Sequence, residues 1–375
     1  MSARLLASSM LLMVTSLAQA QSYTATLLNR PSGADACSEV REGASFLSVN
    51  GDVSTTCTML NVALFGAPFL GTSKATVWRA GSATARTLAG TLTLPRTNAN
   101  GMLSDGTVVG VSYGSGNSAA PSAWKTTTRA NYPMPAGYSG WEIDRTSPDG
   151  QTVLIRRRND GSAYGHSFAL IKAGVTRAVT PPPAACGSLN GMGEHHSWVI
   201  NNLGHMAIGH SKVIYVPNAS DDEPGTVCIW DGDAWHVSPR TPNFTFPDGT
   251  SADSYELNLQ AFSDQGEVLV NRIVKFTWHA TQGFKQVNAR ARTFTSTGEI
   301  AGGAEPTATD YREKAVLWRN GQPVQLSEVA TAPAGYQLST VLATNPRGQV
   351  LVLAQALGDT VASTLKSRLV LLTPR

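Results

Sequence analysis

The stretch INNLGHMAIGHS, residues 200–211, contains the pattern that decides the fold. A polar turn ends in Gly204, and a short strand follows in which Met206 and Ile208 alternate with other residues. Glycine takes the positive φ that a tight β-turn needs without a steric penalty. The alternation after it predicts a β-strand with one face to bury. A phrase of this kind, if it recurs, indicates a repeat architecture.

The phrase does recur along the chain. Similar turns and strands begin at Ser48, Leu103, Ser147, Phe262, Phe294 and Thr344, and the copy at Ser48 is the weakest. The turn glycines lie about 50 residues apart on average, a spacing typical of propeller blades. They are Gly51, Gly106, Gly150, Gly204, Gly266, Gly298 and Gly348.

A second phrase follows most copies, a short strand that ends in tryptophan: Trp78, Trp124, Trp230, Trp278 and Trp318. A tight turn and a further short strand come next, so that one period holds about four strands. A four-stranded sheet of this size cannot bury both faces alone, but a ring of such sheets can. The sequence therefore predicts an all-β fold, a propeller of about seven four-stranded antiparallel blades.

Two further structural expectations follow from this architecture. Trp78, Trp230, Trp278 and Trp318 should be buried at equivalent places between blades, because a large aromatic ring can cover the apolar surface there. The strand at residues 22–28 should pair with the strand at residues 367–373 and so close the ring.

The run from Ile200 to Ser211 resembles one half of the HAF repeat of bacterial extracellular proteins, a phrase of the form IN-x-x-G-x-V-x-G-x-S. The other half, HAFLW-x-NG, is similar to Ala315–Gly321 and to residues 166–170. The resemblance covers most of residues 45–375 in scattered copies, and the copies at Gly51 and Gly150 depart from it. It implies an exported, propeller-like repeat protein and brings no catalytic residues.

The first residues have the form of a secretory signal peptide, with basic Arg4, an apolar run and a small-x-small site ending at Ala20. We therefore expect a signal peptide at residues 1–20, one β-propeller domain at residues 21–375, and a periplasmic or secreted protein without a transmembrane segment. The formal net charge of +3 gives no reason to expect nucleic acid as a partner.

Four cysteines in an oxidising compartment suggest two disulfides, for which three pairings exist. We favour Cys37–Cys57 and Cys186–Cys228, because the members of each pair are nearest in sequence.

A histidine cluster offers a possible metal site: His195, His196, His205 and His210. Zinc requires three or four converging ligands. However, His205 and His210 occupy variable positions of the repeat, so we expect no metal and no cofactor, and keep His195, His196 and His210 as the candidates if a metal binds.

A candidate catalytic group lies around a predicted hairpin turn at residues 159–161. Arg156 and Arg158 share one face of the first strand, and Tyr164 and His166 could lie opposite on the returning strand. Arginine could neutralise a uronate carboxylate, with Tyr or His as base and acid of a β-elimination. The alternative is a solvated hairpin with a local run of charge.

Trp141 and Trp235 fall outside the repeated tryptophan position and are candidate platforms for a sugar ring. The sequence contains no G-x-S-x-G elbow, phosphate-binding loop or dinucleotide fingerprint. We therefore expect a monomeric binding or interaction module whose ligand is an extracellular glycan or protein. The competing hypothesis is a propeller-fold polysaccharide lyase or hydrolase that acts on an acidic glycan.

Overall fold

The protein is described here in a computed structural model. The structure describes residues 22–37, 45–59, 72–114, 118–158, 166–186, 194–212, 223–241, 244–245, 251–252, 257–271, 275–287, 290–304, 313–319, 322–357 and 367–375. The predicted signal peptide and Tyr164 lie outside these residues.

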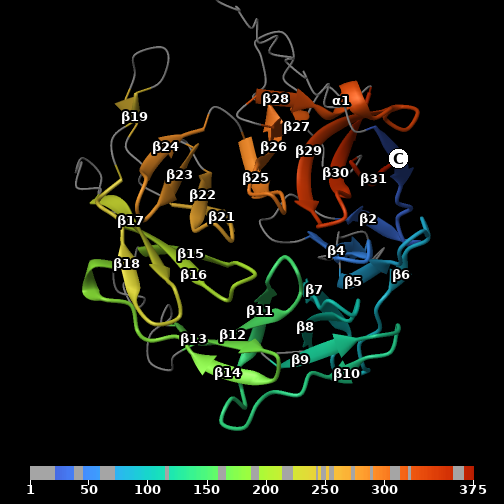
Figure 1. The fold of residues 1–375 in the computed structure, drawn as a ribbon. Coiled ribbons are helices and arrows are strands. Elements are labelled where there is room, and N and C mark those ends of the chain that lie inside the picture. Colours follow the sequence, from blue (N-terminus) through green and yellow to red (C-terminus); the bar gives the residue numbers. More distant parts are fainter. Residues whose placement is uncertain are drawn as a thin grey trace, which may run out of the picture.

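The described strands form a seven-bladed β-propeller, in which seven antiparallel sheets stand around a central axis (Figure 1). The first strand of each blade lies innermost. Blade 1 consists of β3 (Ser45–Leu47), β4 (Val53–Met59), β5 (Thr72–Trp78) and β6 (Arg86–Thr87). Blade 2 consists of β7 (Arg96–Met102), β8 (Val108–Tyr113), β9 (Ala119–Trp124) and β10 (Ala130–Asn131). Blade 3 consists of β11 (Glu142–Thr146), β12 (Thr152–Arg158), β13 (His166–Lys172) and β14 (Val175–Ala178).

Blades 4 to 7 follow the same plan, and the ring closes on itself. Blade 4 consists of β15 (Glu194–Ile200), β16 (Met206–Lys212), β17 (Glu223–Trp230) and β18 (Trp235–Val237), and blade 5 of β21 (Leu259–Phe262), β22 (Glu267–Asn271), β23 (Lys275–His279) and β24 (Gly283–Gln286). Blade 6 consists of β25 (Arg290–Phe294), β26 (Ile300–Ala304), β27 (Lys314–Arg319) and β28 (Gln322–Gln325). Blade 7 consists of β29 (Tyr336–Thr344), β30 (Val350–Ala356), β31 (Arg368–Pro374) and β1 (Tyr23–Leu27). Pairing of β1 with β31, from Tyr23 opposite Pro374 to Leu27 opposite Val370, confirms the predicted closure.

The remaining described elements are small. A hairpin joins β19 (Phe244–Thr245) to β20 (Ser251–Ala252), and the described helices are α1 (Leu326–Val329) and the 3-10 turn η1 (Ala184–Cys186). None of the helices in the described residues is long and apolar enough to cross a membrane.

All seven predicted turn glycines join the first strand of a blade to the second, and each has a positive φ, between 70° and 92°. In six of the seven turns a side-chain oxygen accepts a hydrogen bond, at 2.9–3.1 Å, from a backbone N–H four or five residues later; these residues are Ser48, Ser147, Asn201, Ser263, Thr295 and Asn345. Some turns also bond to the next blade, as where Asn345 Nδ2 donates to Ser48 O at 2.8 Å. The repeated phrase thus forms a hydrogen-bonded rim.

The repeated tryptophans end the third strand of their blades. The side chains of Trp78, Trp124, Trp230 and Trp278 are at most 2% exposed. This confirms the predicted burial of Trp78, Trp230 and Trp278. Trp318 occupies the same position but is only half-buried, so the prediction holds there in part. Three of the four buried tryptophans lie opposite the first residue of the second strand, for example Trp124 opposite Val108, and Trp278 lies opposite the second residue, Val268.

Both predicted disulfides are present, Cys37–Cys57 and Cys186–Cys228, and the described residues include no free cysteine. Cys37 lies in β2 (Ala34–Cys37), which pairs with the same strand, β4, as β3 does. The inner edge of blade 1 is therefore made of two short strands, and the disulfide fastens one of them to β4. The second bridge joins η1 to β17 within blade 4.

Candidate ligand-binding channel

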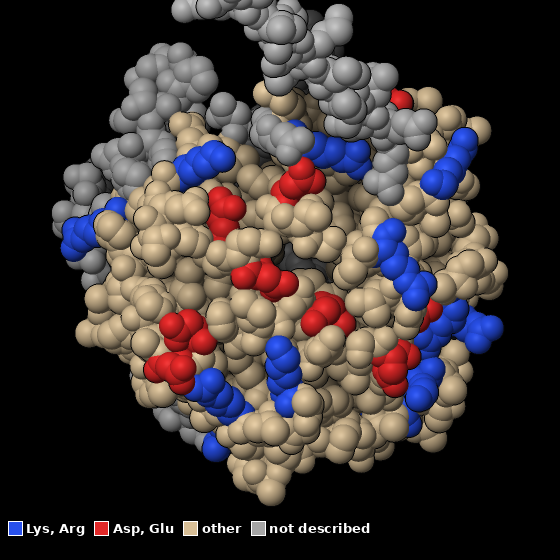
Figure 2. All heavy atoms as spheres, in the orientation of Figure 1, with Lys and Arg blue, Asp and Glu red and all other residues tan. Residues whose placement is uncertain are grey.

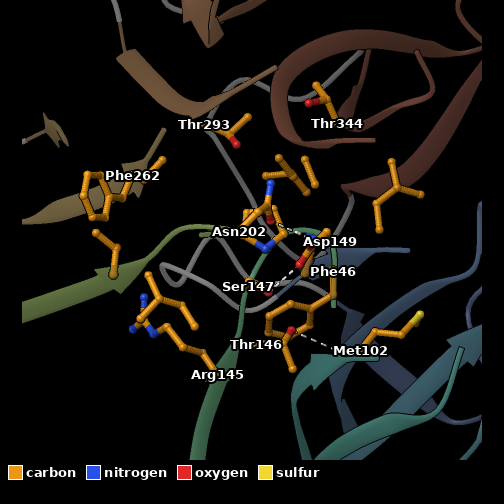
Figure 3. Close-up of a pocket in the computed structure, with 18 of the residues that line it drawn as sticks. Phe46, Met102, Arg145, Thr146, Ser147, Asp149, Asn202, Phe262, Thr293 and Thr344 are labelled. Atoms are coloured by element: carbon orange, nitrogen blue, oxygen red, sulfur yellow. Dashed lines mark hydrogen bonds between the residues drawn. The ribbon is translucent and has the colours of Figure 1, made fainter. Parts of the chain in front are cut away.

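A cavity of about 570 Å³ occupies the centre of the ring, and residues from the inner strands of all seven blades line it. The space-filling view shows a hollow at the centre of one face, with acidic side chains around it (Figure 2). The wall mixes aromatic and aliphatic side chains, such as Phe46, Met102 and Phe262, with hydroxyl and carboxamide groups, such as Thr293 and Asn202 (Figure 3). Such a mixture is typical of small-molecule sites.

The inner strands carry a structural irregularity that the repeat pattern alone does not reveal. In blades 2, 3, 5, 6 and 7 the pairing of the first strand with the second skips a residue at the same place, and blade 7 skips Ser339 as well. The skipped residue lies six positions before the turn glycine: Asn100, Asp144, Gln260, Arg292 and Leu342. A β-bulge re-aims a side chain, and four of these five residues line the cavity.

Asp144 is the centre of a charged cluster on the wall. Its carboxylate accepts hydrogen bonds from Arg145 Nε at 3.0 Å and from Trp198 Nε1 at 2.8 Å, and forms an ion pair with Arg156, whose Nε lies 3.0 Å away. The Asp144 side chain is only 8% exposed, so these partners replace water. Arg156 also lies 4.0 Å from Glu142 Oε2 and stacks over the Trp198 ring, 5.5 Å from its centroid.

Tyr113, at the end of β8, is close to this cluster. Burial raises the pKa of Tyr113, and the negative charge of Glu142 raises it further, whereas Arg156 and Arg96 act in the opposite direction. The phenol therefore stays protonated at neutral pH and can donate a hydrogen bond.

At the turn-side end of the cavity, Asn202 joins blade 4 to both neighbouring blades. Its backbone N–H and its Nδ2 each donate to the Asp264 carboxylate at 2.9 Å, and its Oδ1 accepts from the backbone N–H of Asp149 at 2.8 Å. Figure 3 shows Asn202 beside Asp149 in the cavity. These bonds fix the turns of blades 3, 4 and 5 at the channel mouth.

The structure brings part of the predicted catalytic group together. Arg158 pairs with His166 across β12 and β13, and the His166 ring lies 5.2 Å from the Trp198 ring over which Arg156 stacks. Arg156 lines the cavity. The side chain of Arg158 and all of Tyr164 lie outside what the structure describes. Within the described residues, the structure thus places Arg156 and His166 near one aromatic ring, that of Trp198.

The candidate metal residues occupy two paired strands. His196 lies opposite His210, and His195 lies opposite Ser211. Only His210 has a described side chain. Within the described part of the chain, no group of three or more His, Cys, Asp or Glu residues could hold a metal ion.

Neither tryptophan proposed as a sugar platform lies on the cavity wall. Trp141 is half-buried and packs edge-on against Tyr138, with ring centroids 4.8 Å apart. Trp235 lies in the outermost strand of blade 4 and donates from Nε1 to the carbonyl oxygen of Thr180 at 3.1 Å. Any role of these rings in binding would thus be separate from the channel.

Sequence reasoning missed most of the channel wall, including Asn98, Asn100, Asp144 and Gln260. One signal was available, because counting back six residues from each turn glycine reaches the bulged positions. The residues there differ from blade to blade, so a search for repeated residues passes over them.

No family model matches the chain, and no curated protein matches it. Solved structures with the same fold include the β-propeller domain of the Trilobed protease from Pyrococcus furiosus, with a TM-score of 0.50 and 8% identity over 88% of this chain and 94% of that domain. That domain has an open velcro topology by its description, whereas β1 closes the ring here. At such low identity the likeness shows the fold alone.

Two further solved structures are also similar in fold. The acylaminoacyl peptidase of Pyrococcus horikoshii has a TM-score of 0.48 and 9% identity over 91% of this chain, which spans about half, 52%, of that enzyme. The polysaccharide lyase Uly1 has a TM-score of 0.48 and 10% identity over 96% of this chain and 94% of its own.

Proposed function

We propose that the protein is an exported binding module that holds its ligand, a glycan or a segment of a protein, in the central channel. The observation that carries this proposal is the cavity of about 570 Å³ with seven different inner strands as its wall. Ligand sites of small molecules have volumes of about 300–1,000 Å³ and combine apolar surface with a few fixed polar groups. We also propose, from the quoted runs alone, a relationship to the HAF-repeat proteins.

The blade frame suits this role because it holds the wall still. The turns of neighbouring blades are joined by hydrogen bonds, and β1 closes the ring. Binding to a preformed site costs less conformational entropy than binding to a mobile one. The two disulfides fit an oxidising compartment, and so support export.

The competing function, β-elimination on an acidic glycan, needs an arginine that can turn to a uronate carboxylate. Arg156 already binds Asp144 and lies near Glu142. A uronate would have to compete with these two carboxylates, which favours the binding module over the lyase. The decisive readout is absorbance in the unsaturated-uronate band during incubation with anionic polysaccharides. We expect no rise; a rise that disappears in Arg156→Ala and His166→Ala would overturn this part of the proposal.

The channel itself is tested by blocking it. Thr293 lines the cavity (Figure 3), and Thr293→Trp would fill much of its width. We expect this variant to lose at least tenfold in affinity for any ligand found on a glycan and peptide array. Thr127→Trp is the matched control, because Thr127 is exposed on the surface. Equal binding by both variants, with unfolding curves like the wild type, would show that the ligand binds elsewhere.

A further inference from the structure

The charged groups of the channel wall all have partners within the protein. The wall contains five such residues: Asp144, Arg145, Asp149, Arg156 and Asp264. Asp144 binds both arginines, and Asp264 accepts two hydrogen bonds from Asn202. Asp149 accepts from the Ser147 hydroxyl at 2.6 Å and from the Gln151 N–H at 3.0 Å. Each of these charged groups is therefore already held in place by neighbouring groups of the protein.

Two neutral side chains on the same wall each have a buried polar atom without such a partner among the described residues. Asn98, in β7, and Gln260, in β21, both line the cavity. Asn98 Oδ1 and Gln260 Nε2 are buried, and neither has a hydrogen-bond partner among the described residues. Leaving a buried polar group unsatisfied costs about 1–3 kcal/mol, so such groups in native proteins call for an explanation, of which a bound ligand or water is one.

The two carboxamides lie on opposite sides of the channel. Asn98 belongs to blade 2 and Gln260 to blade 5, and two blades separate them in one direction and three in the other, the largest separation that a seven-bladed ring allows (Figure 1). The unpartnered atom is an acceptor in Asn98 and a donor in Gln260, and because both atoms are fully buried, each carboxamide has to turn about its last side-chain bond to offer that atom to a ligand. A ligand that spans the channel can satisfy both, and a hydroxyl group serves either purpose because it both donates and accepts.

We infer that the channel binds an uncharged, hydroxyl-rich ligand of the class of neutral oligosaccharides, held between the carboxamide groups of Asn98 and Gln260. This inference rests on the proposed function and names its ligand class. The half-buried ring of Phe46 and the hydroxyls of Thr56, Thr58 and Ser73 belong to the same wall and suit the apolar and hydroxyl faces of a sugar.

The wall suits an extended peptide less well than a sugar. Peptides are commonly held by adding a strand to a regular sheet edge. Bulges interrupt five of the seven inner strands, and a bulge disrupts the ladder that such pairing needs.

The experiment is titration calorimetry with three panels of ligands: neutral oligosaccharides of three to six sugars, oligogalacturonates of the same lengths, and short peptides. Each is measured at low and at high salt. We expect binding within the neutral panel, with a Kd that changes less than twofold with salt because no charge pairs form. Asn98→Ala and Gln260→Met should each weaken this binding about tenfold or more, a factor that corresponds to the loss of one well-placed hydrogen bond.

Matched controls use the same substitutions on the surface. Asn131→Ala and Gln151→Met change exposed side chains and should leave the Kd unchanged. The inference is overturned if no neutral oligosaccharide binds, or if one binds equally well to Asn98→Ala and Gln260→Met. Salt-sensitive binding of an oligogalacturonate or a peptide that Thr293→Trp abolishes would refute the neutral ligand yet keep the channel. Binding that is indifferent to Thr293→Trp would refute the proposed function itself.

Discussion

Two positions of the same inner strand and turn differ sharply in their freedom to vary. The turn position holds glycine in all seven blades, always with positive φ. The position six residues earlier holds seven different residues in the seven blades: Ser45, Asn100, Asp144, Trp198, Gln260, Arg292 and Leu342. Five of these are the bulged residues of the inner strands.

The difference separates what builds the ring from what the ring presents. The glycine serves a backbone conformation that is the same in every blade, so the same residue is needed each time. The position six residues earlier lies on the inner strand, beside the channel or an adjacent blade, and its surroundings differ from blade to blade. A repeat protein can therefore keep its frame while the residue six positions before the turn glycine changes from blade to blade.

The largest effect that tests the turn position should come from Gly150→Ala. A Cβ on Gly150 would lie 2.5 Å from Met102 O and 2.6 Å from Ser104 N, both backbone atoms of the neighbouring blade. The strain of a positive φ costs about 1–2 kcal/mol, and the steric overlap adds about 1–3 kcal/mol. We expect the free energy of unfolding, measured by denaturant titration, to fall by about 2–5 kcal/mol.

Gly204→Ala is the matched comparison for that variant. Gly204 has a φ of 85°, but a Cβ there would meet nothing closer than 3.9 Å. Only the backbone strain of about 1–2 kcal/mol should remain. Equal losses in the two variants would show that contact between neighbouring turns contributes nothing, and that the rim is held by turn conformation alone.

A smaller effect is expected from a substitution in the channel wall, which should leave the free energy of unfolding almost unchanged rather than lower it. Gln260→Met removes an amide whose buried Nε2 has no hydrogen-bond partner among the described residues, and replaces it with an apolar side chain of similar length. Replacing such a group is nearly neutral or stabilising, so the free energy of unfolding should change by less than about 1 kcal/mol. A loss of 2 kcal/mol or more would mean that the amide is part of the frame, and the contrast between turn and wall would fail.

The frame could be predicted from the sequence because its residues repeat. The turn glycines and the strand-ending tryptophans give the period, and sequence proximity gave both disulfides. The half-buried state of Trp318 was not foreseen, because exposure depends on what the adjacent blade supplies. The division of the inner edge of blade 1 into β2 and β3 was not foreseen either. The copy of the repeated phrase in this blade is the weakest of the seven.

The candidate site was harder to predict because it is assembled across blades. Arg156 was named from its own hairpin, but Asp144 and Trp198, which fix its position, come from two other strands, one of them in the next blade. A bulge also depends on how two strands pair, which one strand alone does not show. Local reasoning found Arg156 and the opposition of Arg158 to His166, and missed the ring of residues around the axis.

The smallest expected effect concerns His205, the residue directly after a turn glycine. Burial lowers the pKa of His205 from its usual 6.5, with Lys172 and His236 acting in the same direction and Asp231 and Asp264 against it. Below the unfolded pKa the unfolded chain then binds more protons than the folded one, so this residue makes stability fall as the pH drops below about 6.5.

Blade 7 has Gln349 in the place that His205 occupies in blade 4, and a neutral side chain is therefore compatible with the turn. We expect His205→Gln to lessen the loss of stability between about pH 7.5 and pH 5, and to leave the free energy of unfolding at pH 7.5 almost unchanged. Urea titrations of both proteins at the two pH values measure the difference. An identical pH dependence in the variant would mean that His205 is as well solvated in the folded protein as in the unfolded chain, and that the rim by blade 4 is more open than its hydrogen bonds indicate.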